Sequence, residues 1–86
     1  MTEQESIALV NDIFVESFEI AREDLRPDAH LFRDLGLDSL DAVDLIVALQ
    51  QKFDVKIRDD ERIRSIQTLQ SLYDLILTIK KEQESR

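Results

Sequence analysis

Apolar residues recur at intervals of three or four positions in three stretches of this 86-residue chain, a spacing typical of amphipathic α-helices. The first two predicted helices cover residues 2–18 and 39–53, and the third begins after Thr68, a candidate N-cap. A shorter helix is predicted to start at Asp59-Asp60-Glu61, after a short extended piece at Val55-Lys56-Ile57. The pattern therefore predicts an all-α fold, a small antiparallel bundle of three longer helices plus one short helix.

Each predicted helix carries an apolar stripe that can face a common core, with the residues of a stripe three or four positions apart. The residues assigned to these stripes are Ile7, Val10, Ile13, Phe14, Phe18, Leu40, Val43, Leu45, Ile46, Leu49, Phe53, Ile63, Ile66, Leu69, Leu72, Leu75, Ile76 and Ile79.

Capping residues mark where the helices begin. Thr2 with Glu5 forms a candidate capping box for the first helix, and Ser6 is an alternative start. Asp38 is the predicted N-cap of the central helix, because an aspartate carboxylate accepts hydrogen bonds from free amides of the first turn. Asp41 lies three residues further on, so a variant capping box is predicted there as well.

The segment from residue 19 to residue 38 is a long connection between the first two helices. Connections of this length are uncommon in small domains and often functional. One short turn is predicted around Ala29–Asp34, and apolar Leu31, Phe32 and Leu35 are predicted to pin the connection to the core.

Composition narrows the class of protein. One glycine and one proline disfavour an all-β sandwich or barrel, and the absence of cysteine excludes disulfides and thiolate metal sites. No apolar run approaches the roughly 20 residues of a membrane span, and the start of the chain lacks the regions of a signal peptide. We expect one cytoplasmic domain over residues 1–86, monomeric, with a frayed tail at about 82–86.

The formal net charge of −8 makes nucleic acid and anionic membranes poor partners. Partners with basic patches are favoured instead, because opposite charge speeds encounter. Acids at Asp38, Asp41 and Asp44 fall on one face of the central helix, with Val43 and Val47 at its border.

Ser39 is the first residue of the central helix if Asp38 is its cap. Its hydroxyl is then free of capping and lies at the positive end of the helix dipole, where a phosphate is favoured. Nothing near it in the sequence can take its proton. Ser39 therefore suits a hydroxyl that another enzyme esterifies, rather than a catalytic nucleophile.

The run Gly36-Leu37-Asp38-Ser39-Leu40-Asp41-Ala42-Val43-Asp44-Leu45 resembles the phosphopantetheine attachment site of acyl carrier proteins. The resemblance extends from about residue 7 to about residue 78. It implies that Ser39 carries covalent 4′-phosphopantetheine from coenzyme A, flanked by Asp38 and Leu40. The thiol of this group holds acyl intermediates of fatty acid, specialised lipid or polyketide biosynthesis as thioesters, and the carrier itself is not an enzyme.

The resemblance also implies partners and cargo. The expected partners are a phosphopantetheinyl transferase and acyl-transferring, ketosynthase and other acyl-processing enzymes with basic patches. Their predicted docking residues are Asp38, Asp41, Val43, Asp44 and Val47. The acyl chain is expected to lie between helices, in a space lined by Val43, Ile46, Ile57 and Ile63.

The chain departs from the family pattern after the central helix. Carriers of fatty acid synthesis usually continue with acids, whereas this chain has Gln50-Gln51-Lys52, and Arg58 replaces a common proline. These differences favour a specialised lipid or polyketide-like pathway.

Two other functions are compatible with the same residues. One is an unmodified acidic helical module that binds a basic protein, and the other is a peptidyl or aminoacyl carrier. Peptidyl carriers usually have paired glycines and then histidine or aspartate before the serine, so Leu37-Asp38 favours an acyl carrier. A catalytic or metal site is disfavoured, because His30 is the only histidine and is expected at the surface.

Overall fold

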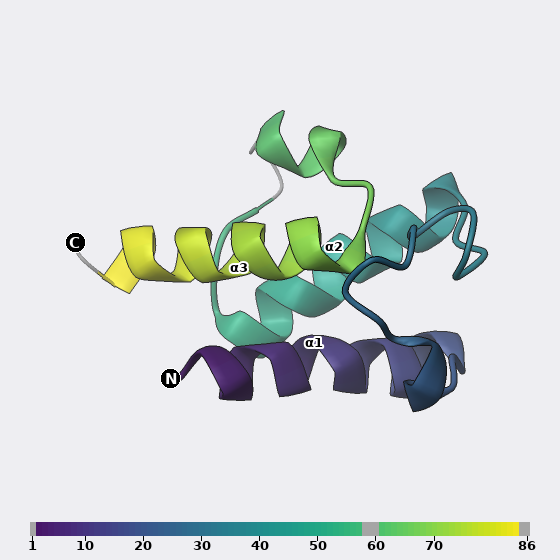
Figure 1. The fold of residues 1–86 in the computed structure, drawn as a ribbon. Coiled ribbons are helices and arrows are strands. Elements are labelled where there is room, and N and C mark those ends of the chain that lie inside the picture. The colour runs from purple at the N-terminus through teal and green to yellow at the C-terminus, as the bar shows by residue number, and fades with distance from the viewer. Residues whose placement is uncertain (1, 58–60, 85–86) are drawn as a thin grey trace.

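A computed structural model describes residues 2–57 and 61–84 of the chain (Figure 1). Its elements, in order, are α1 (Glu3–Phe18), the 3-10 helix η1 (Arg22–Asp24), α2 (Ser39–Phe53), the 3-10 helix η2 (Glu61–Ser65) and α3 (Leu69–Glu84). The described ranges contain no strand, so the predicted all-α class of three longer helices and one short helix is confirmed. The predicted short helix is a 3-10 helix, and the first two residues expected in it lie outside the described ranges.

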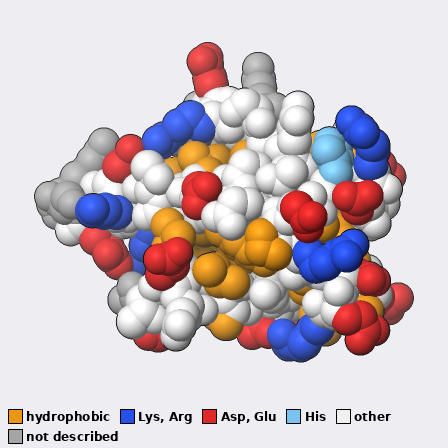
Figure 2. Space-filling model, in the orientation of Figure 1, with side chains coloured by type: hydrophobic (Ala, Val, Ile, Leu, Met, Phe, Trp, Pro, Cys, Tyr) orange, Lys and Arg blue, Asp and Glu red, His pale blue; other side chains and the backbone are white. Residues whose placement is uncertain are grey.

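The three long helices pack around a shared core. Both α2 and α3 contact α1 and run opposite to it, whereas η2 packs against α3 (Figure 1). Apolar side chains reach the surface along the seam between α1 and α3 (Figure 2). Among the described residues, no helix has both the length and the apolar character that a membrane span requires.

The predicted capping box at the start of α1 is confirmed. The Glu5 amide donates to the Thr2 hydroxyl at 3.1 Å, and the Thr2 amide donates to the Glu5 carboxylate at 3.4 Å. The alternative start at Ser6 is wrong, because Ser6 lies inside α1 with its side chain buried. At the other end, Glu19 adopts a left-handed φ of 56° and its amide bonds the Phe14 carbonyl.

The core contains most of the residues predicted to face it. Phe14 and Leu49 have no exposed surface, and Phe18 lies at the edge of the core with its ring centroid 5.9 Å from that of Phe14. Among the described residues, the buried apolar side chains that form the core are Val10, Ile13, Phe14, Ala29, Leu31, Leu37, Leu45, Leu49, Phe53, Val55, Ile57, Ile66, Leu69, Leu72, Tyr73, Leu75, Ile76 and Ile79.

The predicted buried stripe of α2 was wrong at its first two positions. Leu40 is 76% exposed and Val43 is 58% exposed. The buried stripe begins at Leu45, and five residues along a helix correspond to a rotation of about 140°. Leu40 therefore points away from the buried face of α2.

Backbone hydrogen bonds attach the long connection to the start of α3. The Leu31 amide donates to the Gln67 carbonyl at 2.8 Å, and the Leu69 amide donates to the Ala29 carbonyl at 3.1 Å. Leu31 is buried and Leu35 is half-buried, as predicted, whereas Phe32 is 43% exposed, so its assignment to the core was wrong.

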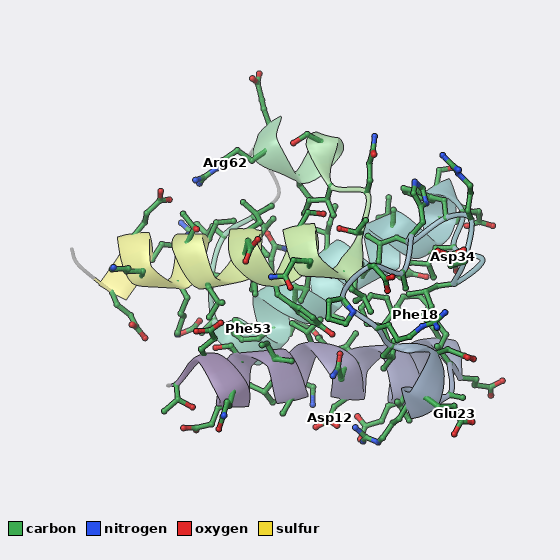
Figure 3. All side chains as sticks on the ribbon, in the orientation of Figure 1. Asp12, Phe18, Glu23, Asp34, Phe53 and Arg62 are labelled. Atoms are coloured by element: carbon green, nitrogen blue, oxygen red, sulfur yellow. The ribbon has the colours of Figure 1, made fainter. Side chains whose placement is uncertain are left out.

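His30 organises the predicted turn in this connection. Its Nδ1 accepts the amides of Phe32 at 3.2 Å and Arg33 at 3.1 Å, and its own amide donates to the Asp34 carboxylate at 2.7 Å (Figure 3). The Nδ1 lone pair therefore faces the two backbone amides inside the turn. The short turn is confirmed, but His30 is half-buried and structural rather than a plain surface histidine.

The C-terminal helix is longer than predicted. Residues 82–84 are helical, so their assignment to a frayed tail was wrong, and residues 85–86 lie outside the described ranges. Gln83 explains the extension, because its amide group bonds both the N–H and the C=O of Lys56, at 3.3 and 3.1 Å. Arg62 of η2 also bonds Glu82 of α3 through two N–H groups, at 3.1 and 2.9 Å (Figure 3).

Tyr73 joins α3 to α1, and its burial gives a testable pH dependence. Its hydroxyl donates to the Asn11 side-chain oxygen at 2.5 Å. Burial raises the pKa of Tyr73 above 10.0, outweighing the opposite effect of the Asn11 hydrogen bond. The folded state therefore keeps its proton where the unfolded state has lost it, so this stabilising contribution is complete below pH 10 and declines as pH rises through the folded pKa.

We expect Tyr73→Phe to lower the free energy of unfolding by about 1 kcal/mol near neutral pH, since one hydrogen bond is lost. Above about pH 10 the difference between parent and variant should shrink. Urea unfolding of both proteins between neutral and alkaline pH measures this difference in the free energy of unfolding. Lysines that titrate in the same range contribute equally to both proteins, so their contribution cancels in the difference. Parallel pH profiles would contradict the assignment.

Candidate functional site

Ser39 is the first residue of α2, directly after the capping residue. Asp38 Oδ1 accepts the Asp41 amide at 2.9 Å, and Asp41 Oδ2 accepts the Asp38 amide at 3.2 Å. The predicted variant capping box is therefore present. The two carboxylates provide the cap, which leaves the Ser39 hydroxyl unused for that purpose.

The approach to Ser39 depends on the only glycine of the chain. Gly36 has a φ of +74°, a conformation that side-chain-bearing residues rarely adopt, although a Cβ there would meet nothing within 4 Å. Next to it, Leu37 is 7% exposed and its amide donates to the Leu31 carbonyl at 3.2 Å. The buried Leu37 side chain thus anchors the loop two residues before Ser39, a role that sequence reasoning missed.

The Ser39 side chain is exposed, and within residues 2–57 and 61–84 no hydrogen bond joins its hydroxyl to another side chain. The only imidazole of the chain already uses Nδ1 in the turn at His30. The same residues contain no group of three or more side chains able to hold a metal ion. The arrangement therefore presents a free hydroxyl without a general base of its own.

The outer face of α2 is formed by side chains that have no helix against them. Leu40, Val43 and Val47 are 76%, 58% and 45% exposed, and Asp44 is exposed beside them. Asp41, by contrast, is half-buried and held in the capping box. Four of the five predicted docking residues are therefore exposed, namely Asp38, Val43, Asp44 and Val47, and the fifth, Asp41, is half-buried.

A cavity of about 280 Å³ lies on another face of α2. Ser39, Ala42 and Ile46 share that face, since residues three and seven positions apart are stacked on a helix. Of the residues predicted to line an acyl space, Ile46 and Ile63 line the cavity, whereas Val43 is on the outer face and Ile57 is packed in the core. The complete lining is Leu31, Phe32, Ala42, Leu45, Ile46, Ile63, Ile66 and Leu72.

Six of the eight lining residues were missed by sequence reasoning: Leu31, Phe32, Ala42, Leu45, Ile66 and Leu72. Ala42 could have been found from its spacing to Ser39, because it lies three residues along the same helix. Leu31 and Phe32 carried no such signal, since they come from the long connection and reach the cavity only through the fold.

We expect Asp38→Ala to lower the free energy of unfolding by about 1 kcal/mol, because the first turn of α2 loses its cap. Asp38→Asn keeps a side-chain oxygen for the Asp41 amide and is the matched control, with a much smaller expected loss. Urea denaturation followed by circular dichroism gives both values. Equal losses for Ala and Asn would show that the hydrogen bond at 2.9 Å does not stabilise the helix start.

Comparisons with known proteins agree with the geometry of this site. A family model described as the phosphopantetheine attachment site matches residues 8–76. The chain is 40% identical over 81 residues to a protein named acyl carrier protein from Cyanidioschyzon merolae, covering 94% of this chain and 88% of that protein. The matched region includes the capped start of α2 and the cavity beside it.

Proposed function

The chain belongs to the acyl carrier protein family, whose members carry 4′-phosphopantetheine, and we propose that Ser39 is the residue that carries it here. The observation that supports this assignment is the exposed Ser39 hydroxyl at the first residue of α2, left free because Asp38 and Asp41 supply the cap. Esterification requires an exposed hydroxyl and no base from the carrier, and Ser39 has this environment. When bound, the group supplies a thiol that holds an acyl chain as a thioester.

The start of α2 suits the phosphodiester that would form on Ser39. The N–H groups of a first helical turn carry partial positive charge and favour a phosphate beside them. The carboxylates of Asp38 and Asp41 are each engaged with an amide, at 2.9 and 3.2 Å, so their positions are defined by the capping box. These residues would orient the attachment point and perform no proton transfer of their own.

The outer face of α2 is the proposed docking surface for partner enzymes. It combines exposed apolar Leu40, Val43 and Val47 with the carboxylate of Asp44, beside Asp38 at the helix start. Exposed apolar side chains rimmed by charge are typical of protein–protein contacts. The proposed partners are a phosphopantetheinyl transferase and acyl-transferring, ketosynthase and acyl-processing enzymes with basic patches, which perform the chemistry while this chain carries the intermediate.

The cavity beside α2 is the proposed place for the acyl chain. Ala42 and Ile46 lead from Ser39 along one helix face into this space, and Ile63 of η2 borders it. Burial of hydrocarbon is favourable by about 0.8 kcal/mol per methylene group. A bound chain would therefore be protected until a partner enzyme compensates for its withdrawal.

The residues at the end of α2 support a proposal about the biosynthetic pathway that this carrier serves. The Gln50 side chain accepts the Ile57 amide at 2.9 Å and is half-buried, so it belongs to the turn after α2 rather than to a docking surface. Gln51 and Lys52 are exposed, where a fatty-acid carrier would usually present acids. We therefore favour a specialised lipid or polyketide-type pathway over primary fatty acid elongation.

The test is the intact mass of the full chain before and after incubation with coenzyme A and a broad-specificity phosphopantetheinyl transferase. We expect the mass of one phosphopantetheinyl group to be added, and peptide mapping to place it on Ser39. An unchanged mass would favour the unmodified interaction module, whereas modification elsewhere would overturn the assignment to Ser39.

A further inference from the structure

One residue closes the turn in the connection before α2. His30 Nδ1 accepts the amides of Phe32 at 3.2 Å and Arg33 at 3.1 Å. The His30 carbonyl accepts the next two amides, those of Asp34 at 2.9 Å and Leu35 at 3.1 Å. Four consecutive backbone N–H groups therefore donate to one residue, and two of these hydrogen bonds depend on its side chain.

The same turn is attached to α3 on one side and to the start of α2 on the other. The Leu31 amide donates to the Gln67 carbonyl at 2.8 Å, just before α3 begins. The Leu31 carbonyl accepts the amide of the buried Leu37 at 3.2 Å, two residues before Ser39. Because Leu31 directly follows His30, the geometry of the turn sets where the Leu31 carbonyl lies, and with it the backbone that leads to Ser39.

We propose that His30 is a positioning residue for the modification of Ser39, and that its imidazole keeps the loop before α2 in the conformation that a transferase recognises. This inference rests on the proposed attachment at Ser39. His30 acts through the turn and not on the hydroxyl, because its Nδ1 faces two backbone amides. A transferase that binds only carriers with an ordered loop has a KM raised by the inverse of the ordered fraction, with kcat unchanged.

Protonation of the imidazole should open the turn. An imidazolium donates from both ring nitrogens, so Nδ1 would have no lone pair left for the amides of Phe32 and Arg33. His30 is half-buried, so protons reach it from solvent (Figure 2). Imidazoles ordinarily titrate near about pH 6.5. The turn should therefore be intact above that pH, and it should open as pH falls below it because the open form binds the extra proton.

The charged groups around His30 do not reverse this expectation. The charged side chains of the connection closest to it in sequence are Asp28, Arg33 and Asp34, all of them exposed. Asp34 accepts the His30 amide at 2.7 Å (Figure 3) and would attract an imidazolium, but solvent screens the attraction of an exposed carboxylate. On the side of α3, Gln67 and Thr68 meet this segment and are uncharged, and the first turn of α3 contains no acid.

The experiment compares His30→Gln with His30→Asn in the full chain. The asparagine oxygen is two bonds from Cβ, as Nδ1 is, and accepts without titrating, whereas the glutamine oxygen is one bond further out. With saturating coenzyme A near neutral pH, we expect His30→Gln to raise the transferase KM for the carrier about fivefold or more with little change in kcat. His30→Asn should recover most of this loss. Amide hydrogen exchange at Phe32, Arg33 and Leu37 should be about fivefold or more faster in His30→Gln than in His30→Asn.

A pH profile separates positioning from general structural support. The ratio of kcat/KM for the parent to kcat/KM for His30→Asn removes the titration of the transferase itself. This ratio should be constant above about pH 7 and fall about threefold or more by about pH 5.5. Tyr73→Phe is the control for stability, because it removes a hydrogen bond between α1 and α3 and should leave the KM at the value of the parent.

Equal KM values and exchange rates for His30→Gln and His30→Asn would overturn the inference, as would a ratio that does not change with pH. In either case the proposed function stands, provided that the intact mass still shows one group on Ser39. Absence of added mass on the parent would overturn the proposed attachment and this inference together.

Discussion

Ser39→Ala should abolish modification by coenzyme A and a phosphopantetheinyl transferase while leaving the fold intact. The substitution removes the Oγ atom that would form the phosphodiester, and it removes no hydrogen bond that the structure shows among residues 2–57 and 61–84. Alanine also favours a helix slightly more than serine, by a few tenths of a kcal/mol. The expected result is a complete loss of added mass with unchanged or slightly increased stability.

Two measurements separate this outcome from unfolding. Intact mass reports the modification, and far-ultraviolet circular dichroism with urea denaturation reports the helices. Ser65→Ala is a suitable control, because Ser65 is also exposed but lies in η2 and bonds the Arg62 carbonyl at 2.9 Å. This control should be modified as fully as the parent. Added mass on Ser39→Ala would show that another residue carries the group.

Asp44→Lys should reduce the rate constant kcat/KM of the transferase reaction by about tenfold or more at low ionic strength. Asp44 is exposed on the proposed docking surface, and no hydrogen bond or ion pair joins its carboxylate to another residue in the described part of the chain. Reversing its charge therefore changes the encounter with a basic partner without breaking a structural contact. Asp41 is a poorer probe, because its substitution would also break the capping box at 2.9 and 3.2 Å.

The control for net charge is Glu3→Lys, which changes the charge by the same amount at the start of α1, at the other end of the bundle from the start of α2 (Figure 1). Its expected effect on kcat/KM is smaller, since the changed charge lies far from the proposed docking surface and the Coulomb interaction weakens with distance. The difference between the variants should shrink as salt is added. Equal losses for Asp44→Lys and Glu3→Lys would mean that overall charge, rather than this surface, attracts the transferase.

The sequence by itself determined the helices and the position of the proposed attachment residue, because both depend on short-range interactions. A capping box involves residues three positions apart, so Thr2 with Glu5 and Asp38 with Asp41 could be recognised before any fold was known. The position of Ser39 at the start of α2 followed from the same cap. Apolar periodicity located the three long helices for a similar reason, since it is a property of each segment alone.

Long-range contacts were not predictable in the same way. Gln83 extended α3 by bonding Lys56, 27 residues away, so a polar tail that would fray alone became helical. Gln50 acquired a structural role from the Ile57 amide, and His30 from two amides of its own turn. Each of these polar side chains could equally have been solvated, and only the folded backbone brought a partner within reach.

The tertiary structure alone decided which face of α2 is buried. Its sequence is apolar over more than half of its circumference, from Leu40 and Val43 to Leu45, Ile46 and Leu49, so periodicity permitted more than one buried stripe. Burial of Leu45, Leu49 and Phe53 in the core left Leu40 and Val43 in solvent. Ile63 and Ile66, from the chain after Phe53, line one cavity together with Ala42 and Ile46. A helix buries the face that its neighbours cover, and the positions of those neighbours are set by connections whose path no local pattern encodes.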